Sequence, residues 1–204
     1  MKISANVEFI EGTLANSYAI FTDEETFLID AGTRGSGKKI ISYFEKTNRK
    51  PDVVLITHYH PDHIGGLRLI YERFKPRIYV PDSELDVVRG NAKIIPAKSI
   101  LSHLISRFSR IDIVPEAEPV SNFSNKNISI LPTPGHTPQS TSYILNLDKV
   151  IFIGDAFSIK SDGSYVINKA FTLDMDRAKK SMELILSYKG YKVAPGHGSV
   201  FTIK

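Results

Sequence analysis

The stretch that decides the fold is Thr57–Gly66, "THYHPDHIGG", which places three histidines and an aspartate within six positions. It closes the apolar run "DVVLIT", which predicts a buried central strand. In extended chain His58 and His60 point to the same side, so both can reach one ion. Asp62 and His63 lie just beyond the strand and aim elsewhere, where they could hold a second ion. Such polar groups at the end of an apolar strand are costly without partners, so the segment predicts a metal site.

The composition narrows the kind of site. The chain has 204 residues, of which 42% are hydrophobic and 24% charged, which suits one globular domain with a sizeable core. It has no cysteine, so disulfides, thiolate catalysis and cysteine-ligated zinc are excluded. Any metal must therefore be held by histidine and carboxylate.

Charge and hydropathy bear on partners and location. The net charge is +4, and no block of five like charges occurs, so a lysine-rich solvated surface is favoured over a nucleic-acid-binding face. The first residues, "MKISANVEFI", lack the long apolar core and the cleavage site of a signal peptide. No run approaches the ~18 apolar residues that a membrane span needs. We expect a cytoplasmic protein without membrane contact.

Strand and helix patterns repeat in two halves. Strands are expected at 17–22, 26–30, 52–57, 77–80, 127–133, 141–147, 149–155 and 191–195, and helices at 38–48, 64–74 and 174–188. Residues 17–30 read as a hairpin, and Asp174 or its neighbour as a helix cap. Each half has its strands first and a helix late. This order suggests two similar β-rich halves stacked in layers, with the helices outside.

Residues 81–126 interrupt that order. Within them 97–109 predicts a helix with an apolar stripe of Ile100, Leu101, Leu104, Ile105 and Phe108. This stripe either packs into the core or a dimer contact, or forms a flap over the substrate through Ile100, Leu104 or Phe108. A homodimer is therefore one of the assemblies that this stripe allows. His103 falls away from the stripe and is expected to be an exposed residue without a role.

The remaining histidines also follow strands. His136 lies in "PTPGHTP" and His197 in "APGHG", both in loops rich in proline and glycine, where sites are usually built. Asp155 closes the strand "KVIFIGD". A lone histidine in a loop has little meaning, but five of the six histidines and two aspartates occupy strand ends, and this joint pattern is specific.

These motifs, "HYHPDH", the histidine after "TPG", "GD" and "PGHG", resemble those of the metallo-β-lactamase superfamily over nearly the whole chain. The resemblance implies an α+β fold, the αββα four-layer sandwich, as a single domain over 1–204 with a helical insertion at about 81–126. Carried over by motif, the metal ligands would be His58, His60 and His136 for one ion, Asp62, His63 and His197 for the other, and Asp155 as the bridge. Asp30, in "FLIDAG", would support the site from the second shell.

The nitrogen and oxygen donors suit zinc, and also iron or manganese. Two divalent ions about 3.5–4 Å apart would share a water and lower its pKa to about neutral. The bridging hydroxide would then attack a carbonyl or phosphoryl centre, and Asp62 could orient it or shuttle a proton. Candidate contacts for a small-molecule substrate are Lys160, Tyr165 and Lys169 after Asp155, with Leu104 and Phe108.

Within the superfamily, the compact chain looks like the glyoxalase II branch, which implies hydrolysis of a small ester or thioester. Only seven residues follow His197, whereas glyoxalase II proteins add a glutathione-binding helical domain. Ser158 stands where lactonase-like members tend to have tyrosine, and Asp155 is a ligand that lactamases of this fold typically lack. The alternatives are a mononuclear iron dioxygenase of the persulfide type, using His58, His136 and Asp155, and a nuclease or phosphodiesterase acting on RNA or DNA.

Overall fold

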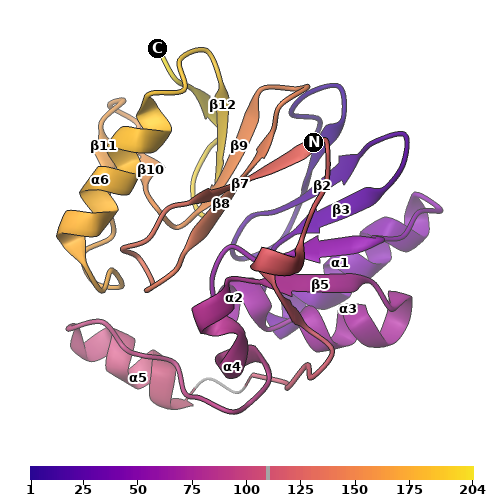
Figure 1. The fold of residues 1–204 in the computed structure, drawn as a ribbon, viewed down its shortest axis with the longest axis horizontal. Coiled ribbons are helices and arrows are strands. Elements are labelled where there is room, and N and C mark those ends of the chain that lie inside the picture. Colours follow the sequence, from indigo (N-terminus) through magenta and orange to yellow (C-terminus); the bar gives the residue numbers. More distant parts are fainter. Residues whose placement is uncertain (109–110) are drawn as a thin grey trace. The chain divides into compact units, whose positions relative to one another are not determined.

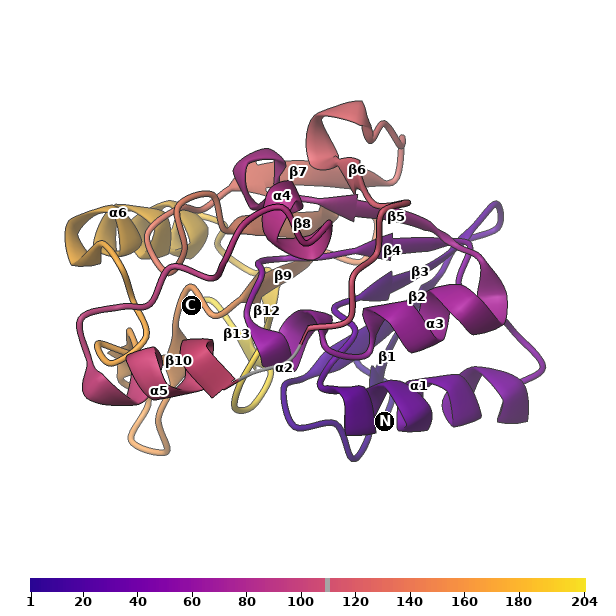
Figure 2. The ribbon, with the colours of Figure 1, turned by 90° about the horizontal axis from the view of Figure 1, so that it is seen from below.

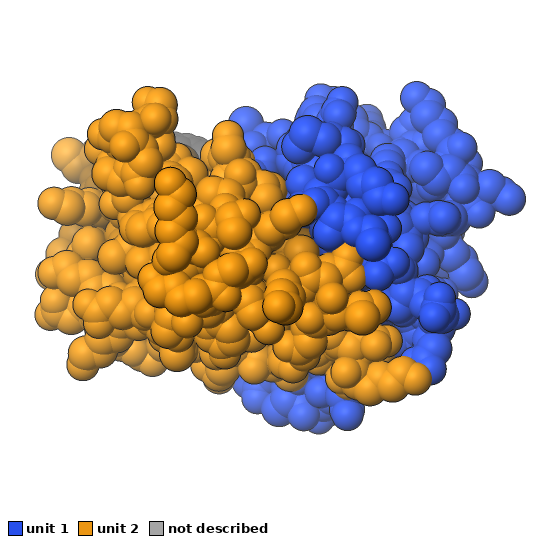
Figure 3. All heavy atoms as spheres, turned by 90° about the horizontal axis from the view of Figure 1, so that it is seen from above, with its two compact units in different colours: residues 1–92, 110–124 blue, residues 93–109, 125–204 orange. Residues whose placement is uncertain are grey.

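The computed structural model describes residues 1–108 and 111–204, and the side chain of Phe108 lies outside the described part. It divides into two compact units, coloured separately in Figure 3. Unit 1 comprises residues 1–92 and 110–124, and unit 2 comprises 93–109 and 125–204. Each unit contains one mixed sheet and its own helices (Figure 1). The prediction of a single domain over 1–204 stays a prediction.

The sheet of unit 1 has six strands in chain order. They are β1 (Val7–Ile10), β2 (Ser17–Phe21), β3 (Thr26–Ile29), β4 (Val53–Leu55), β5 (Arg77–Val80) and β6 (Glu118–Pro119). The hairpin of β2 and β3 is confirmed, with Tyr18 opposite Ile29. From β3 to β6 neighbouring strands are parallel. Strand β4 is central and fully buried, as its apolar run predicts, whereas β6 shows that the zone 81–126 is not only helical.

Unit 1 also contains helices and short 3-10 turns that connect its strands. They are α1 (Arg34–Lys46), α2 (Pro61–Ile64), α3 (Leu67–Phe74), the 3-10 turn η1 (Asp82–Glu84), α4 (Leu85–Val88) and the 3-10 turn η2 (Val120–Asn122). Helices α1 and α3 lie side by side (Figure 2). A Cβ on Gly66 would stand 2.3 Å from the carbonyl oxygen of Ala31 and 2.7 Å from the Cα of Gly37. Only glycine permits this close approach, which sets the start of α3 against α1 and against the residues that follow β3.

The sheet of unit 2 has five strands. Their order is β13 (Phe201–Thr202), β12 (Lys192–Pro195), β9 (Val150–Gly154), β8 (Thr141–Leu145) and β7 (Ile128–Pro132), and β10 (Ser158–Ile159) pairs with β11 (Tyr165–Val166) in a separate hairpin. Helix α6 (Met175–Leu186) begins at Asp174, whose Oδ1 accepts from the backbone N–H groups of Asp176 and Arg177. This confirms the predicted cap. Ala178 and Ile185 of α6 belong to the same buried cluster as residues of β8, β9 and β12.

Helix α5 (Ile100–Phe108) turns its apolar side outward. Ile100 is 81% exposed and Leu104 48%, whereas the polar Ser102 is 4% exposed. The predicted stripe is therefore not core of unit 2, because the residue that faces inward is a serine. Among the described residues, no helix is long and apolar enough to span a bilayer.

Candidate metal centre

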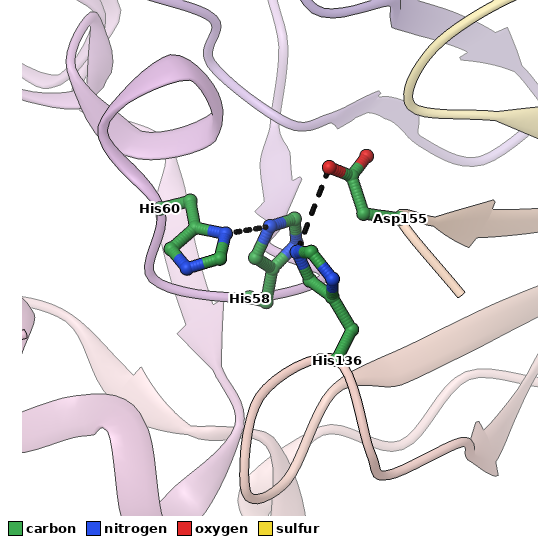
Figure 4. A group of neighbouring side chains, drawn as sticks. All are labelled: His58, His60, His136 and Asp155. Atoms are coloured by element: carbon green, nitrogen blue, oxygen red, sulfur yellow. Dashed lines mark hydrogen bonds and ion pairs between the residues drawn. The ribbon is translucent and has the colours of Figure 1, made fainter. Parts of the chain in front are cut away.

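Three histidines gather within unit 1, just past the end of β4. His58 and His63 are fully buried and His60 is 9% exposed. Nε2 of His58 lies 3.1 Å from Nδ1 of His60 (Figure 4). Two nitrogens that bind one zinc at about 2.0–2.1 Å in tetrahedral geometry stand about 3.3 Å apart. The spacing of these two imidazoles therefore fits a shared ion.

Asp30 orders these rings from the end of β3. Its Oδ1 accepts the backbone N–H of Thr57 at 2.8 Å, and its Oδ2 accepts the Thr57 hydroxyl at 2.8 Å. The same Oδ2 lies 2.7 Å from Nδ1 of His63. The Thr57 hydroxyl proton goes to Asp30, so Thr57 Oγ1 accepts from Nδ1 of His58 at 3.0 Å. The rings of His58 and His63 then each carry their proton on Nδ1, which makes Nε2 the nitrogen suited to binding metal.

Unit 2 brings together His136, Asp155 and His197. Strands β7 and β9 run in the same direction, as do β9 and β12, so the residues that follow them meet at one edge of the sheet. Oδ2 of Asp155 lies 3.6 Å from Nε2 of His136 (Figure 4) and 3.6 Å from Nε2 of His197. A carboxylate oxygen near two imidazole nitrogens that do not share a motif is the arrangement expected of a bridging ligand.

His136 is held in the same way as the rings of unit 1. Its Nδ1 lies 3.4 Å from Oγ1 of Thr172, which is buried and donates its proton to the carbonyl oxygen of Asn168 at 2.7 Å. The threonine oxygen is therefore an acceptor for His136 Nδ1–H, and Nε2 is again the nitrogen turned toward Asp155. The donors within each unit thus fit metal ions chemically, because they are imidazole and carboxylate groups with supported orientations.

A cavity of about 490 Å³ lies beside Asp155 and His197, entirely within unit 2. Its other lining residues are Gly154, Phe157, Ser158, Val166, Ile167, Asn168, Lys169 and Ala170. Lys169, expected to contact a substrate, is among them. Lys160 and Tyr165 instead belong to the β10–β11 hairpin, where the Tyr165 ring packs against Phe157 and Phe201 at 5.6 Å between ring centroids.

Asp62, His103 and His197 are not buried, and the His197 side chain is 45% exposed. Asp62 occupies the first turn of α2 and is partly exposed. His103 is exposed on α5, with Nδ1 2.9 Å from the carbonyl oxygen of Ser99, one turn earlier. It lies on the polar side of α5, as its place off the stripe predicts.

Sequence reasoning missed Thr57, Thr172 and Glu84. Thr57 adjoins the histidine motif and could have been suspected on that ground. Glu84 is fully buried and its Oε2 accepts the backbone N–H of Tyr59 at 2.8 Å. The sequence carries one signal for Glu84. It is an acidic residue soon after β5, and β5 is parallel to β4, the strand that precedes the histidine motif. Thr172 has no signal, because the loop that carries it shows no periodicity.

The chain matches a family model and several known proteins. The model is described as "Metallo-beta-lactamase superfamily" and spans residues 10–197. The protein named "Probable metallo-hydrolase M6_Spy0554", from Streptococcus pyogenes serotype M6, is 29% identical over 213 residues, covering 100% of this chain and 86% of that protein. The solved structure of TTHA1623 in a di-iron-bound form is 23% identical with a TM-score of 0.75, covering 96% of this chain and 93% of the other. This likeness confirms the predicted fold class.

Two shorter matches carry specific names. Hydroxyacylglutathione hydrolase of Mesorhizobium japonicum is 30% identical over 131 residues, which cover 64% of this chain and 42% of that protein. Exodeoxyribonuclease WalJ of Streptococcus pneumoniae is 32% identical over 110 residues, covering 50% and 40%. The two names point to different substrates.

Proposed function

Because the chain belongs to the metallo-β-lactamase superfamily and is a metal-dependent hydrolase, we propose that it cleaves a small ester or thioester at a centre of two metal ions. The observation that carries the dinuclear proposal is the position of Asp155 Oδ2, at 3.6 Å from both His136 Nε2 and His197 Nε2. An ordinary ion pair would need only one of these histidines.

The proposed ligands come from both units. They are His58, His60 and His136 for one ion, Asp62, His63 and His197 for the other, and Asp155 for both. Support within unit 1 comes from the 3.1 Å spacing of His58 and His60 and from the contact of Asp30 with His63. Zinc suits these donors, and iron or manganese suits them also. The bound ions would polarise the scissile carbonyl group and lower the pKa of a water to about neutral.

The side chains around the ligands have their own tasks. Asp30 and Thr57 keep the Nδ1 protons in place, so the rings of His58 and His63 need no rearrangement when they bind metal. Asp62, partly exposed at the start of α2, would orient the attacking water or take up its proton. A carboxylate with access to solvent can pass that proton on.

The cavity beside Asp155 supports a small substrate. Its walls include Phe157, Val166 and Ile167, which suit an apolar acyl chain, and Lys169 at the rim would attract an anionic group. A volume of about 490 Å³ suits a compact metabolite. The relative named hydroxyacylglutathione hydrolase supports a thioester, although the match covers 42% of that protein. A cytoplasmic location and a homodimer stay predictions.

The nuclease is the second candidate, and the match to exodeoxyribonuclease WalJ favours it. A net charge of +4 without a charged block gives a polynucleotide little to bind. The iron dioxygenase would leave Asp62, His63 and His197 without a metal to bind.

Metal analysis and activity assays distinguish the hydrolase, the dioxygenase and the nuclease. We expect protein purified without added metal to contain two zinc ions per chain and to cleave acyl thioesters and p-nitrophenyl esters. One iron per chain with oxygen consumption would establish the dioxygenase instead. Digestion of single-stranded DNA with no esterase activity would establish the nuclease. His103→Ala serves as the control for purification and folding, because His103 is exposed and outside the site.

A further inference from the structure

Two buried carboxylates, Asp30 and Glu84, accept hydrogen bonds from the backbone of the histidine segment on opposite sides. The pairing of β4 with β5 ends at Ile56, whose backbone N–H donates to the carbonyl oxygen of Tyr79. Beyond it, the N–H of Thr57 donates to Asp30, which follows β3, and the N–H of Tyr59 donates to Glu84, which follows β5. Since β3 and β5 flank β4, each neighbouring strand is followed by a carboxylate that accepts a backbone N–H where the strand pairing has stopped: Asp30 comes directly after β3, and Glu84 four residues after β5.

Glu84 is costly to bury, so its presence needs a reason. Its side chain is fully buried in the turn between β5 and α4, in a chain whose other glutamates lie at least partly exposed. A buried carboxylate is tolerated only where hydrogen bonds satisfy it. An apolar residue would fill the same space at lower cost, so the reason for a glutamate here lies in the group that it binds, the backbone N–H of Tyr59.

We propose that Glu84 is a positioning residue for the metal ligands, acting through the backbone of Tyr59. Tyr59 separates His58 from His60, so rotation of its peptide plane would swing the two imidazoles apart. The hydrogen bond from Tyr59 to Glu84 Oε2 fixes that plane and preserves the 3.1 Å spacing of His58 Nε2 and His60 Nδ1. This proposal rests on the proposed metal site, and it assigns to Glu84 on the β5 side the task that Asp30 has on the β3 side.

Substitutions at Glu84 separate the hydrogen bond from the charge. Glu84→Ala removes both, Glu84→Gln keeps an acceptor of the same reach without the charge, and Glu84→Asp keeps the charge but falls short of Tyr59. Asp86→Ala is the matched control, because Asp86 is an exposed carboxylate two positions further on, in helix α4. The readouts are the visible spectrum and affinity of added Co²⁺ with metal-free protein, and the exchange rate of the Tyr59 amide hydrogen measured by NMR without metal.

We expect Glu84→Ala to weaken Co²⁺ binding by about 10- to 100-fold, to change the Co²⁺ spectrum and to speed exchange at Tyr59. Glu84→Gln should retain most of the affinity, Glu84→Asp should lose it, and Asp86→Ala should match the wild type. If Glu84→Ala does not fold by circular dichroism, the Gln and Asp variants decide. Wild-type affinity in Glu84→Asp together with loss in Glu84→Gln would overturn the proposal, because charge and not the hydrogen bond would then matter.

The same measurements distinguish a failure of the proposed metal site from a failure of the proposed role of Glu84. If wild-type protein binds no Co²⁺, the metal site is wrong, while exchange at Tyr59 still judges the role of Glu84 in the backbone. If Co²⁺ binds and Glu84→Ala leaves affinity, spectrum and exchange unchanged, Glu84 has no positioning role and the metal site stands.

Discussion

Oδ2 of Asp30 lies 2.7 Å from Nδ1 of His63, and neither side chain is exposed by more than 2%. Asp30 adopts a left-handed backbone conformation, with φ of 57°, at the end of β3. Aspartate and asparagine tolerate this region better than other residues with a side chain. The unusual backbone thus directs the carboxylate toward both Thr57 and His63.

Replacing Asp30 should weaken metal binding before it unfolds the protein. Asp30→Asn keeps the size and the tolerated backbone but loses the charge that holds the imidazole proton. We expect its metal affinity to fall about 10- to 100-fold, measured by titration of metal-free protein. Asp30→Ala should also lose roughly 1–3 kcal/mol of unfolding free energy in urea, because Thr57 is left unsatisfied. Unchanged metal affinity in both variants would contradict the role of Asp30.

His60 and His103 should differ in their importance for activity. His60 is 9% exposed and lies within the motif, whereas His103 is exposed on α5. We expect His60→Ala to abolish hydrolysis of an acyl thioester and to lower the metal content, and His103→Ala to retain wild-type kcat and KM. Comparable losses in both variants, with intact circular dichroism spectra, would show that His103 is not a spare residue.

Helix α5 is expected to cover the substrate cavity. Ser99 Oγ accepts the N–H of Ser102 and donates to the carbonyl oxygen of Ala170 at 2.6 Å, so the start of α5 is fastened to a residue of the cavity wall. Leu104 lies on its exposed apolar side and does not line the cavity, so it would contact an acyl chain that extends beyond the cavity along the helix. Leu104→Ser, alone or with Phe108→Ser, should raise KM for long acyl thioesters with little change in melting temperature.

The matched control for α5 is Leu184→Ser, because Leu184 is 43% exposed on α6 and Leu104 is 48% exposed. It should change neither KM nor melting temperature. Conversion of a dimer to monomers in light scattering by Leu104→Ser would identify the apolar side as a subunit interface. A melting temperature that drops by many degrees with normal kinetics would show that Leu104 supports the fold and not the substrate.

Stability should decline at alkaline pH because of Tyr18. Burial raises the pKa of the Tyr18 phenol above its ordinary value of 10.0. The folded state therefore keeps a proton that the unfolded state loses, so the stability from this group is complete below pH 10 and is lost as pH rises above it. Tyr18→Phe should flatten the fall in unfolding free energy between pH 9 and 11, measured in urea. The exposed Tyr165→Phe is the control, and equal slopes in both variants would contradict the prediction.

Local sequence determined much of this protein. The run "DVVLIT", the hairpin of residues 17–30 and the cap at Asp174 depend on neighbours a few positions away, so periodicity and residue type predicted them correctly. The candidate ligands could also be named from sequence, because they follow apolar runs and because their motifs resemble those of the superfamily.

Only the tertiary structure decided which distant groups support those ligands and which way α5 faces. Glu84 reaches Tyr59 across 25 positions, and Thr172 reaches His136 across 36. These contacts follow from strand order and loop paths, which no local pattern encodes. Periodicity likewise showed that α5 has an apolar stripe, but it did not show which side of the helix faces the protein. That side is set by the contacts that the helix makes with distant residues. Here Ser99 and Ser102 are anchored inward, and the leucines and isoleucines are left outside.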